Sequence, residues 1–257
     1  MLYQFLHGLL ADRKGGAIFT LFSAWHFLYI ALAIIAITVL LLLMRKKDTL
    51  AREKLTRSLC FAAFGMYVTD FFLMPLAYDE IDIEKLPFHA CTAMCTACFL
   101  SYFIPFLGKY RTSFAFLGLI SNLVYLIYPA GVMWHAVHPV SYRVIQTLLF
   151  HALMTVYTLL LLIWQRDRIR IKTCYRELTI TACMTLWAML GNYAYNGQSQ
   201  KYDHFFNWFF VVRDPFYAIP AEVAPFLMPF LNVALFFAVE MLIHVGLWVL
   251  RTKKKSS

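Results

Sequence analysis

Charged residues are scarce in this chain. Asp, Glu, Lys and Arg make up 14% of its 257 residues, whereas hydrophobic residues make up 61%. This shortage of charge argues against a soluble globular domain, which needs far less apolar surface at this size. Several apolar runs reach about 20 residues, the length at which a helix spans roughly 30 Å of hydrocarbon. The composition therefore predicts an all-α, multi-pass protein of the cell membrane with a single domain, residues 1–257.

The sequence also offers no clear set of metal ligands. His89 and Cys91 are close together, but at positions i and i+2 of a helix their side chains point about 200° apart and cannot share an ion. Most of the six cysteines lie inside apolar runs, where a thiol behaves as a small hydrophobe. We therefore expect neither a metal nor a cofactor.

The net charge of +9 gathers beside the ends of the apolar runs, which argues against nucleic acid as a partner. Alternate loops hold 17 of the 23 Lys and Arg residues, and the loops on the opposite side hold 6. Basic residues are retained on the cytoplasmic side of a membrane. This predicts a seven-transmembrane-helix bundle with the N-terminus out and the C-terminus in. The expected helices cover residues 21–44, 58–76, 86–107, 112–131, 143–164, 177–195 and 223–250, between an interfacial lead, 1–20, and a basic cytoplasmic tail, 251–257.

Residues 86–107 are the least lipid-like of the expected helices. Pro87 suits a first turn, where its missing N–H costs no hydrogen bond, and His89 follows about one turn inside. Small and polar residues occupy two sides of the helical projection, with His89, Thr92, Ala93 and Thr96 on one and Cys91, Cys95 and Cys98 on the other. Neither side resembles a lipid-facing surface, so this helix is predicted to pack between neighbours near the centre of the bundle.

Polar residues of several expected helices converge on the outer half of the membrane. An ionisable residue inside a membrane is costly without a partner and marks a functional site by default. His151 shares a helix face with Thr147, Thr155 and Thr158, which can orient its ring. The candidate site comprises His89, His151 and Cys91 as catalytic residues, and Gln146, Asn192, Tyr193, Asp70 and Asp214 as substrate-binding residues.

Other intramembrane polar residues are interpreted mainly as packing. Hydrogen bonds between membrane helices are worth about 0.6–2 kcal/mol and often have no further role. Asn122 and the cysteine stripe are expected to be structural on this ground. The same holds for Glu240 and His244, which lie at i and i+4 toward the cytoplasmic side and can pair with each other. For Asp70 and Asn192, structural and functional roles both stay open.

Three short motifs, in order, resemble those of the YwaF-like integral membrane proteins of bacteria. The first two are P-x-H-x-C at residues 87–91 and Q-x4-H at 146–151. The third is Leu190-Gly191-Asn192-Tyr193, which resembles the G-x-N-Y helix end of that family. The resemblance covers the second to the seventh of the expected helices. That family is distantly similar to a eukaryotic transmembrane family implicated in acyl transfer onto lysophospholipids through a cysteine and a histidine. Asp214-Pro215-Phe216-Tyr217 resembles a motif of that branch. In the eukaryotic branch a cysteine directly precedes the histidine that corresponds to His89, whereas this chain has Phe88 at that position. The nearest thiol of this chain, Cys91, lies on another helix face.

Two kinds of function fit these residues. The first is an enzyme that modifies lipid acyl groups, by transfer or hydrolysis. Its outer-leaflet site would lie on the third, fifth and sixth expected helices, residues 86–107, 143–164 and 177–195. His151 or His89 would be the general base. The nucleophile would be Cys91, a nearby threonine or a water. Asn192 and Tyr193 could donate hydrogen bonds to an oxyanion.

The second kind of function is a non-enzymatic transporter or small-ligand receptor that uses the same intramembrane polar cluster to bind its ligand. For either function, membrane lipids are the expected partners, because most of the chain is predicted to lie in contact with them.

Overall fold

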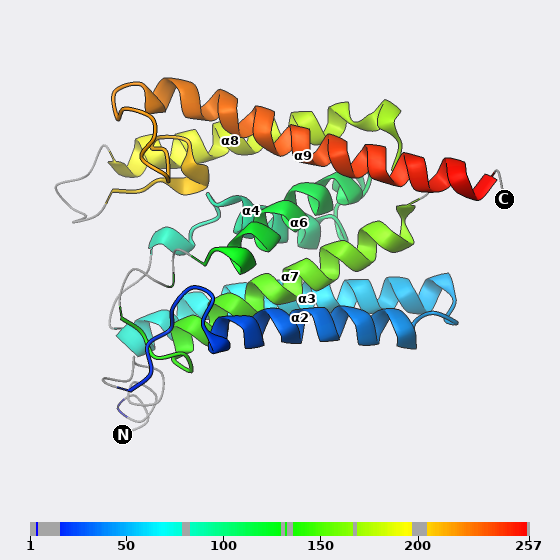
Figure 1. Cartoon of the computed structure of the whole chain (residues 1–257), viewed down its shortest axis with the longest axis horizontal. Helices are drawn as coiled ribbons and strands as arrows, with labels where there is room; N and C mark the ends of the chain where they lie inside the picture. Colours follow the sequence, from blue (N-terminus) through cyan, green and yellow to red (C-terminus); the bar gives the residue numbers. More distant parts are fainter. Residues whose placement is uncertain are drawn as a thin grey trace.

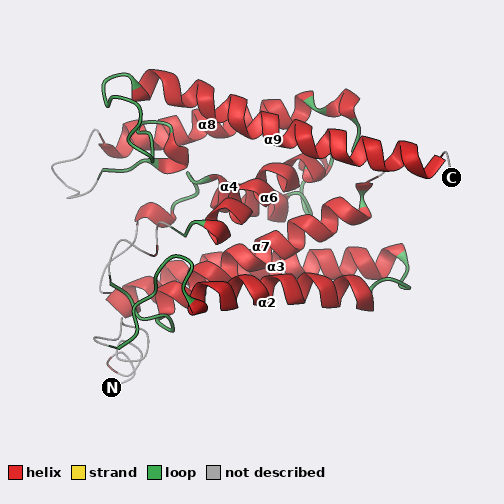
Figure 2. Ribbon diagram, in the orientation of Figure 1, coloured by secondary structure: helices red, strands yellow, loops and turns green. Residues whose placement is uncertain are grey.

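The computed structural model of the chain describes residues 16–78, 83–129, 136–166, 169–196 and 205–255, together with the single positions 4 and 132. Within these residues the protein forms eight α-helices, three short 3-10 turns and no β-strand (Figure 2). The predicted all-α class is therefore confirmed. Most of the predicted interfacial lead, residues 1–20, lies outside the described residues.

The helices follow the predicted order, with shifts at their ends. Ser23 begins the first by accepting the N–H of His26 at 3.3 Å. The second starts at Thr49 rather than at residue 58, because Asp48 accepts the N–H of Ala51 at 2.7 Å and polar turns precede the apolar run. The elements are α2 (Ala24–Leu43), α3 (Thr49–Tyr78), η1 (Ile83–Lys85), α4 (Ala90–Leu100), α5 (Pro105–Gly108), α6 (Arg111–Ile127), α7 (Tyr142–Trp164), η4 (Ile171–Thr173), α8 (Tyr175–Asn196), η5 (Trp208–Phe210) and α9 (Ala224–Lys255).

The long helices are arranged in three layers (Figure 1). α8 and α9 form the upper layer, α4 and α6 the middle one, and α2, α3 and α7 the lower one. α6 joins the layers because it contacts α4, α7, α8 and α9. α7 is the most enclosed of the four longest apolar helices, with 67% of its most apolar stretch buried, compared with 11% for the peripheral α2.

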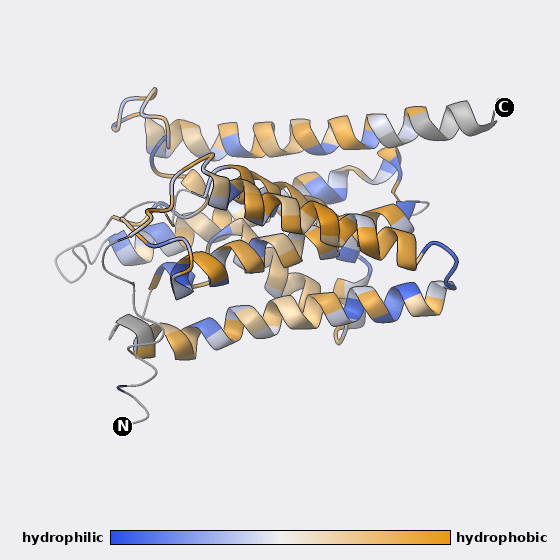
Figure 3. Cartoon of the chain, turned by 60° about the horizontal axis from the view of Figure 1, so that its bottom comes forward, coloured by the Kyte–Doolittle hydropathy of each residue, from blue (hydrophilic) through white to orange (hydrophobic). Residues whose placement is uncertain are grey.

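Among the described residues, four helices are long and apolar enough to cross a membrane. They are Ala24–Leu43, Thr49–Leu76, Tyr142–Trp164 and Ala224–Gly246, and α4 and α6 are shorter apolar helices. Figure 3 shows hydrophobic residues along most of α9 and hydrophilic residues in the loop between α2 and α3. Many large apolar side chains are exposed on the outer helices. Such a surface is suited to lipid, which offers no hydrogen bonds to polar groups.

The apolar run at residues 86–107 does not form one continuous helix. α4 covers only Ala90–Leu100, and the short α5 follows it. Pro105 explains the break, because its missing N–H and its ring prevent an α-helix from continuing through it, and Ile104 before it is extended. His89 is therefore the N-cap of α4 rather than a residue one turn inside a helix. The predicted central position of this segment agrees with the contacts of α4, which packs against both α3 and α6.

Small side chains let α4 approach its neighbours closely. Cys95 and Cys98 are fully buried, together with Cys60 of α3 and Ala115 of α6. These thiols are all free. Cys95 and Cys98 have C-x-x-C spacing, yet the described residues contain no group of three His, Cys, Asp or Glu side chains placed to hold a metal ion. The complete burial of Cys95 and Cys98 agrees with the packing role expected for small side chains between helices.

Candidate functional site

Most of the candidate residues gather at the end of the bundle where α2, α4, α7 and α9 begin, on the left in Figure 1. Successive long helices run in opposite directions, so α3, α6 and α8 finish at this same end. The turns η1 and η5 lie there too. Residues far apart in the sequence are thereby brought to one depth of the bundle.

His151, in α7, is deeply buried, with only 5% of its surface exposed. Its Nδ1 lies 2.7 Å from the carbonyl oxygen of Thr147, one turn earlier. A carbonyl oxygen only accepts, so Nδ1 carries the proton of the neutral ring and Nε2 is an acceptor. This Nε2 is buried and has no hydrogen-bond partner among the described residues. The ring stacks on Tyr125 of α6 with centroids 3.8 Å apart, which fixes its orientation.

His89 has the complementary tautomer. Its Nδ1 accepts the backbone N–H of Phe209 at 3.4 Å, so the proton of its neutral ring lies on Nε2. Thr92 donates its hydroxyl to the carbonyl oxygen of His89 at 3.1 Å and stabilises the start of α4. His89 can therefore donate a hydrogen bond through Nε2, whereas His151 can accept a proton through the same atom.

Asp70 connects three elements around the histidines. Its side chain is 1% exposed, and its Oδ2 lies 2.9 Å from the ammonium nitrogen of Lys85 in η1. Tyr142, at the start of α7, donates its hydroxyl to Oδ1 at 2.6 Å. Both oxygens of this buried carboxylate are thus engaged by the protein, so Asp70 acts here as an anchor for Lys85 and Tyr142.

The positive charge of Lys85 acts on all three catalytic candidates. It interacts electrostatically with His89, Cys91 and His151, and His89 also interacts with His151. Cys91 is the second residue of α4 and is half-buried. The backbone N–H of Thr92 lies within hydrogen-bonding reach of its sulfur.

Asn192 holds the turn η5 in place. Its amide nitrogen donates to the carbonyl oxygens of Ala188 and Trp208, at 2.8 and 3.0 Å, and its oxygen accepts the Trp208 N–H at 2.9 Å. Asn232 of α9 donates to the carbonyl oxygens of Phe209 and Phe210 at 2.6 and 3.1 Å. Both N–H groups of Asn192 are therefore used within the protein, and its side chain positions the turn that contacts His89.

Trp208 closes the space between η1, α4 and α8. It is 1% exposed, and its ring packs against those of Phe88, Tyr195 and Phe206 with centroids 4.9, 5.3 and 4.6 Å apart. Its indole N–H donates to the carbonyl oxygen of Glu84 at 3.3 Å. The turn η5 is thus a packed part of the bundle, with Trp208 as its anchor.

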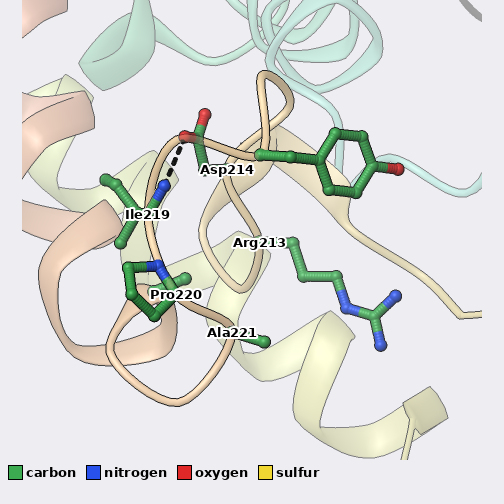
Figure 4. Close-up of a pocket in the computed structure, with 7 residues that line it drawn as sticks. Arg213, Asp214, Ile219, Pro220 and Ala221 are labelled. Carbon is green, nitrogen blue, oxygen red and sulfur yellow. Dashed lines mark hydrogen bonds between the residues drawn. The ribbon is translucent and has the colours of Figure 1, made fainter.

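Asp214 shapes the loop that follows. Its carboxylate accepts the backbone N–H groups of Phe216, Ala218 and Ile219, at 2.9, 2.7 and 3.0 Å, the last of which is dashed in Figure 4. These hydrogen bonds, led by that from Phe216, lower the pKa of Asp214. A hollow of about 300 Å³ lies beside it, lined in part by Arg213. The carboxylate is committed to its own loop rather than to the histidines.

Tyr193 and Gln146 differ sharply in exposure. Tyr193 is 85% exposed and lines a hollow of about 530 Å³ between the end of α8, residues 205–212 and the start of α9. Gln146 is buried and accepts the hydroxyl of Thr147 at 3.2 Å. His89, Cys91 and His151 do not line either hollow. His89, Cys91 and His151 therefore share the electrostatic influence of Lys85, whereas Tyr193 and Asp214 line separate hollows.

The sequence did not predict that Lys85, Tyr142 and Trp208 contact residues of the candidate site. Lys85 carried a usable signal, because it is the single basic residue in an otherwise acidic loop and stands two residues before Pro87. Tyr142 and Trp208 gave none, since aromatic residues are abundant throughout the chain, with 15 Tyr and 6 Trp. Their partners, Asp70 and Asn192, lie far away in the sequence.

Comparison with known proteins adds one finding. The model of the TMEM164 family, a family of transmembrane proteins, matches residues 21–255 and so includes every described helix. No match was found among curated proteins or among solved structures.

Proposed function

Since the chain belongs to the TMEM164 family of transmembrane proteins, we propose that it is an enzyme that modifies the acyl groups of membrane lipids. The reaction is acyl transfer or hydrolysis, and it takes place around His151, His89 and Cys91. The resemblance of three motifs of this chain to those of the YwaF-like proteins of bacteria supports the proposal. That family is in turn distantly similar to the eukaryotic branch implicated in acyl transfer, which supports the same reaction.

One observation carries this proposal, the state of the His151 ring. Its Nδ1 is bound to the carbonyl oxygen of Thr147, while its buried Nε2 has no hydrogen-bond partner among the described residues. A fixed, neutral imidazole with a free acceptor nitrogen is what a general base requires. A histidine that served packing alone would be expected to satisfy both nitrogens, because an unpaired buried acceptor costs about 1–3 kcal/mol.

Cys91 is the proposed nucleophile. Its thiol gives its proton to Nε2 of His151, and the sulfur forms a bond to the acyl carbonyl carbon of a phospholipid while His89 donates to the carbonyl oxygen. The ester C–O bond then breaks, and the leaving lysolipid takes the proton from the imidazolium. A hydroxyl group of a second lysolipid, or water, then attacks the thioester carbonyl carbon and gives its proton to His151. The C–S bond breaks, and the imidazolium returns the proton to the sulfur, which restores the Cys91 thiol and the neutral His151.

The proposed setting is the outer half of the cell membrane, with seven spanning segments, the N-terminus outside and the C-terminus inside. The charge distribution between alternate loops supports this topology. The alternating direction of α2, α3, α4, α6, α7, α8 and α9 agrees with it (Figure 1). α4 and α6 are short for a span, but they form the middle layer, where other helices rather than lipid surround them.

The experiment uses purified full-length protein in nanodiscs that contain phospholipid with a labelled acyl chain, with and without added lysophospholipid. Label on the added lysophospholipid identifies transfer, and labelled free fatty acid identifies hydrolysis. We expect Cys91→Ala to abolish either reaction. Cys183→Ala is the matched control, because Cys183 is an exposed thiol on α8, and it should leave the rate unchanged.

Saturable lipid binding without any turnover would contradict the enzyme and favour the alternative function, a transporter or small-ligand receptor. Turnover that survives in Cys91→Ala would remove Cys91 as the nucleophile and leave a water or a threonine hydroxyl in that role.

A further inference from the structure

A second group of buried ionisable residues lies at the opposite end of the bundle from the histidine site. Glu177 is in the first turn of α8, while Glu240 and His244 lie in the second half of α9. Their exposed fractions are 3%, 0% and 2%. The residues lie where α8 and α9 meet the middle layer, since α6 contacts both helices.

The three side chains do not form a closed set of pairs. Ser113 of α6 donates its hydroxyl to one oxygen of Glu177 at 2.7 Å, and the other oxygen lies 3.6 Å from Nε2 of His244. Thr181 donates to one oxygen of Glu240 at 3.4 Å, which is a long hydrogen bond. Glu240 and His244 therefore bond to other helices rather than to each other, although the sequence suggested that they could pair.

Three buried atoms of this cluster lack a hydrogen-bond partner among the described residues. They are the second oxygens of Glu177 and Glu240 and Nε2 of His244. Two of these atoms, Oε2 of Glu177 and Nε2 of His244, face each other at 3.6 Å, so the second oxygen of Glu240 is the one without a polar group opposite it. An unsatisfied polar atom in a buried place indicates a ligand that the side chains themselves do not supply. The described residues contain no group of His, Cys, Asp and Glu arranged to hold a metal ion, so a proton fits better than a metal.

The charge of this cluster also indicates a proton as its ligand. Glu177 and Glu240 interact electrostatically, and His244 can compensate only one of the two carboxylates. With both carboxylates ionised, the cluster would therefore hold at least one uncompensated negative charge in a nearly water-free place. A buried charge without a partner is neutralised by a change of protonation instead of being retained. We propose that Glu177, Glu240 and His244 form a buried proton-binding site, in which Glu240 carries the exchangeable proton.

Other charged groups near the cluster do not replace this proton. From α8, Arg176 interacts electrostatically with Glu177, but its guanidinium lies over the rings of Tyr110 and Tyr175, 5.6 and 5.9 Å from their centroids. From η4, Lys172 is exposed. α6 contributes the Ser113 hydroxyl and the Phe116 ring, which stacks on His244.

Glu240 is proposed to exchange this proton with water. The O–H bond of the Glu240 carboxylic acid breaks, the proton passes to water, and the carboxylate keeps the electron pair. The Thr181 hydroxyl then donates to a charged rather than a neutral acceptor, which strengthens that hydrogen bond. Uptake of a proton reverses these changes, and neither direction involves the lipid reaction.

Infrared difference spectroscopy of the purified full-length protein tests this proposal, in a detergent that contains no carbonyl group. The wild type at neutral pH should show the C=O stretching band of a protonated carboxylic acid, which disappears at alkaline pH. Glu240→Gln should lose this band. Thr181→Val should shift it to higher frequency, because a hydrogen bond to the C=O oxygen is removed.

Glu222→Gln is the matched control, since Glu222 is an exposed carboxylate just before α9, and this variant should keep the band unchanged. The proposal is overturned if the wild type shows no such band at neutral pH, a result that does not depend on the folding of any variant. It is also overturned if Glu240→Gln, with the helix content of the wild type, retains the band.

Discussion

At Gly191 the absence of a side chain allows α8 to pass the Phe88 ring. A Cβ added to Gly191 would lie 2.5 Å from two atoms of that ring, a separation that no packed carbon atoms tolerate. We predict that Gly191→Ala lowers the free energy of unfolding by about 1–3 kcal/mol, because the ring must be displaced. Phe88 also contacts Trp208, so the displacement reaches the turn η5.

The matched control for Gly191→Ala is Gly65→Ala. Gly65 lies inside α3, and an added Cβ there would meet nothing within 4 Å. Alanine at this position should stabilise the helix by about 0.5–1 kcal/mol. Thermal unfolding followed by circular dichroism compares the two, and equal melting temperatures for the two variants would contradict the packing described for Phe88.

Asn192 offers a second prediction at the scale of one residue. Asn192→Ala removes three hydrogen bonds and leaves the buried N–H and C=O of Trp208 without their partner. The expected loss of stability is about 2–4 kcal/mol, since unsatisfied buried groups cost about 1–3 kcal/mol each and partly relax. Tyr193→Ala, one residue along the same helix but 85% exposed, should change stability by less than about 0.5 kcal/mol. If Asn192→Ala and Tyr193→Ala had the same melting temperature, the turn η5 would not depend on the hydrogen bonds of the Asn192 side chain.

The conformation of the loop before α9 depends on the hydrogen bonds that Asp214 accepts. Its pKa is lowered from the ordinary value of 3.8, so the stabilisation it provides is complete above that value and is lost as the pH falls through the lowered one. Asp214→Ala should therefore be less stable than the wild type at about pH 6, and this difference should shrink toward about pH 3. Melting temperatures measured by tryptophan fluorescence at both pH values check this. A difference that grows as the pH falls would have the wrong sign.

The apolar runs predicted the helices well, because burial and lipid contact both require a continuous run of hydrophobic residues. The ends were less predictable. α4 is shorter than the run that contains it, since Pro105 interrupts the helix while apolar residues continue on both sides. α3 is longer than its run, because the charged turns from Thr49 onward are helical outside the most apolar stretch.

The candidate site was predictable in part. His89 and His151 stood out because ionisable residues are rare in apolar runs, and the structure gives each ring a defined tautomer. Asn192 and Asp214 were included because they were predicted at the same depth as the histidines, yet their polar atoms bind backbone groups of nearby loops. Periodicity within one helix cannot reveal such partners, because these contacts depend on how η5 and the following loop fold back.

At the scale of the whole molecule, the proposed topology places the C-terminal tail in the cytoplasm. Alkaline phosphatase, which is active only outside the cytoplasm, should be inactive when fused after residue 257 and active when fused after residue 204, in the loop before α9. Charge asymmetry between the loops is the reason for this expectation. Activity of the C-terminal fusion, or inactivity of both fusions at normal expression, would refute the seven-span arrangement.

His151 is proposed to act as the base in the lipid reaction. Its direct test is the maximal rate of acyl release by His151→Gln, which keeps hydrogen-bonding groups but cannot accept a proton near neutral pH. We predict a loss of about 10²–10⁴-fold with lipid affinity and helix content unchanged. His89→Gln should weaken lipid affinity more than it lowers the maximal rate. His138→Gln, which replaces a histidine of the loop before α7, should match the wild type. A His151→Gln protein that releases acyl groups at the full wild-type rate would contradict the account.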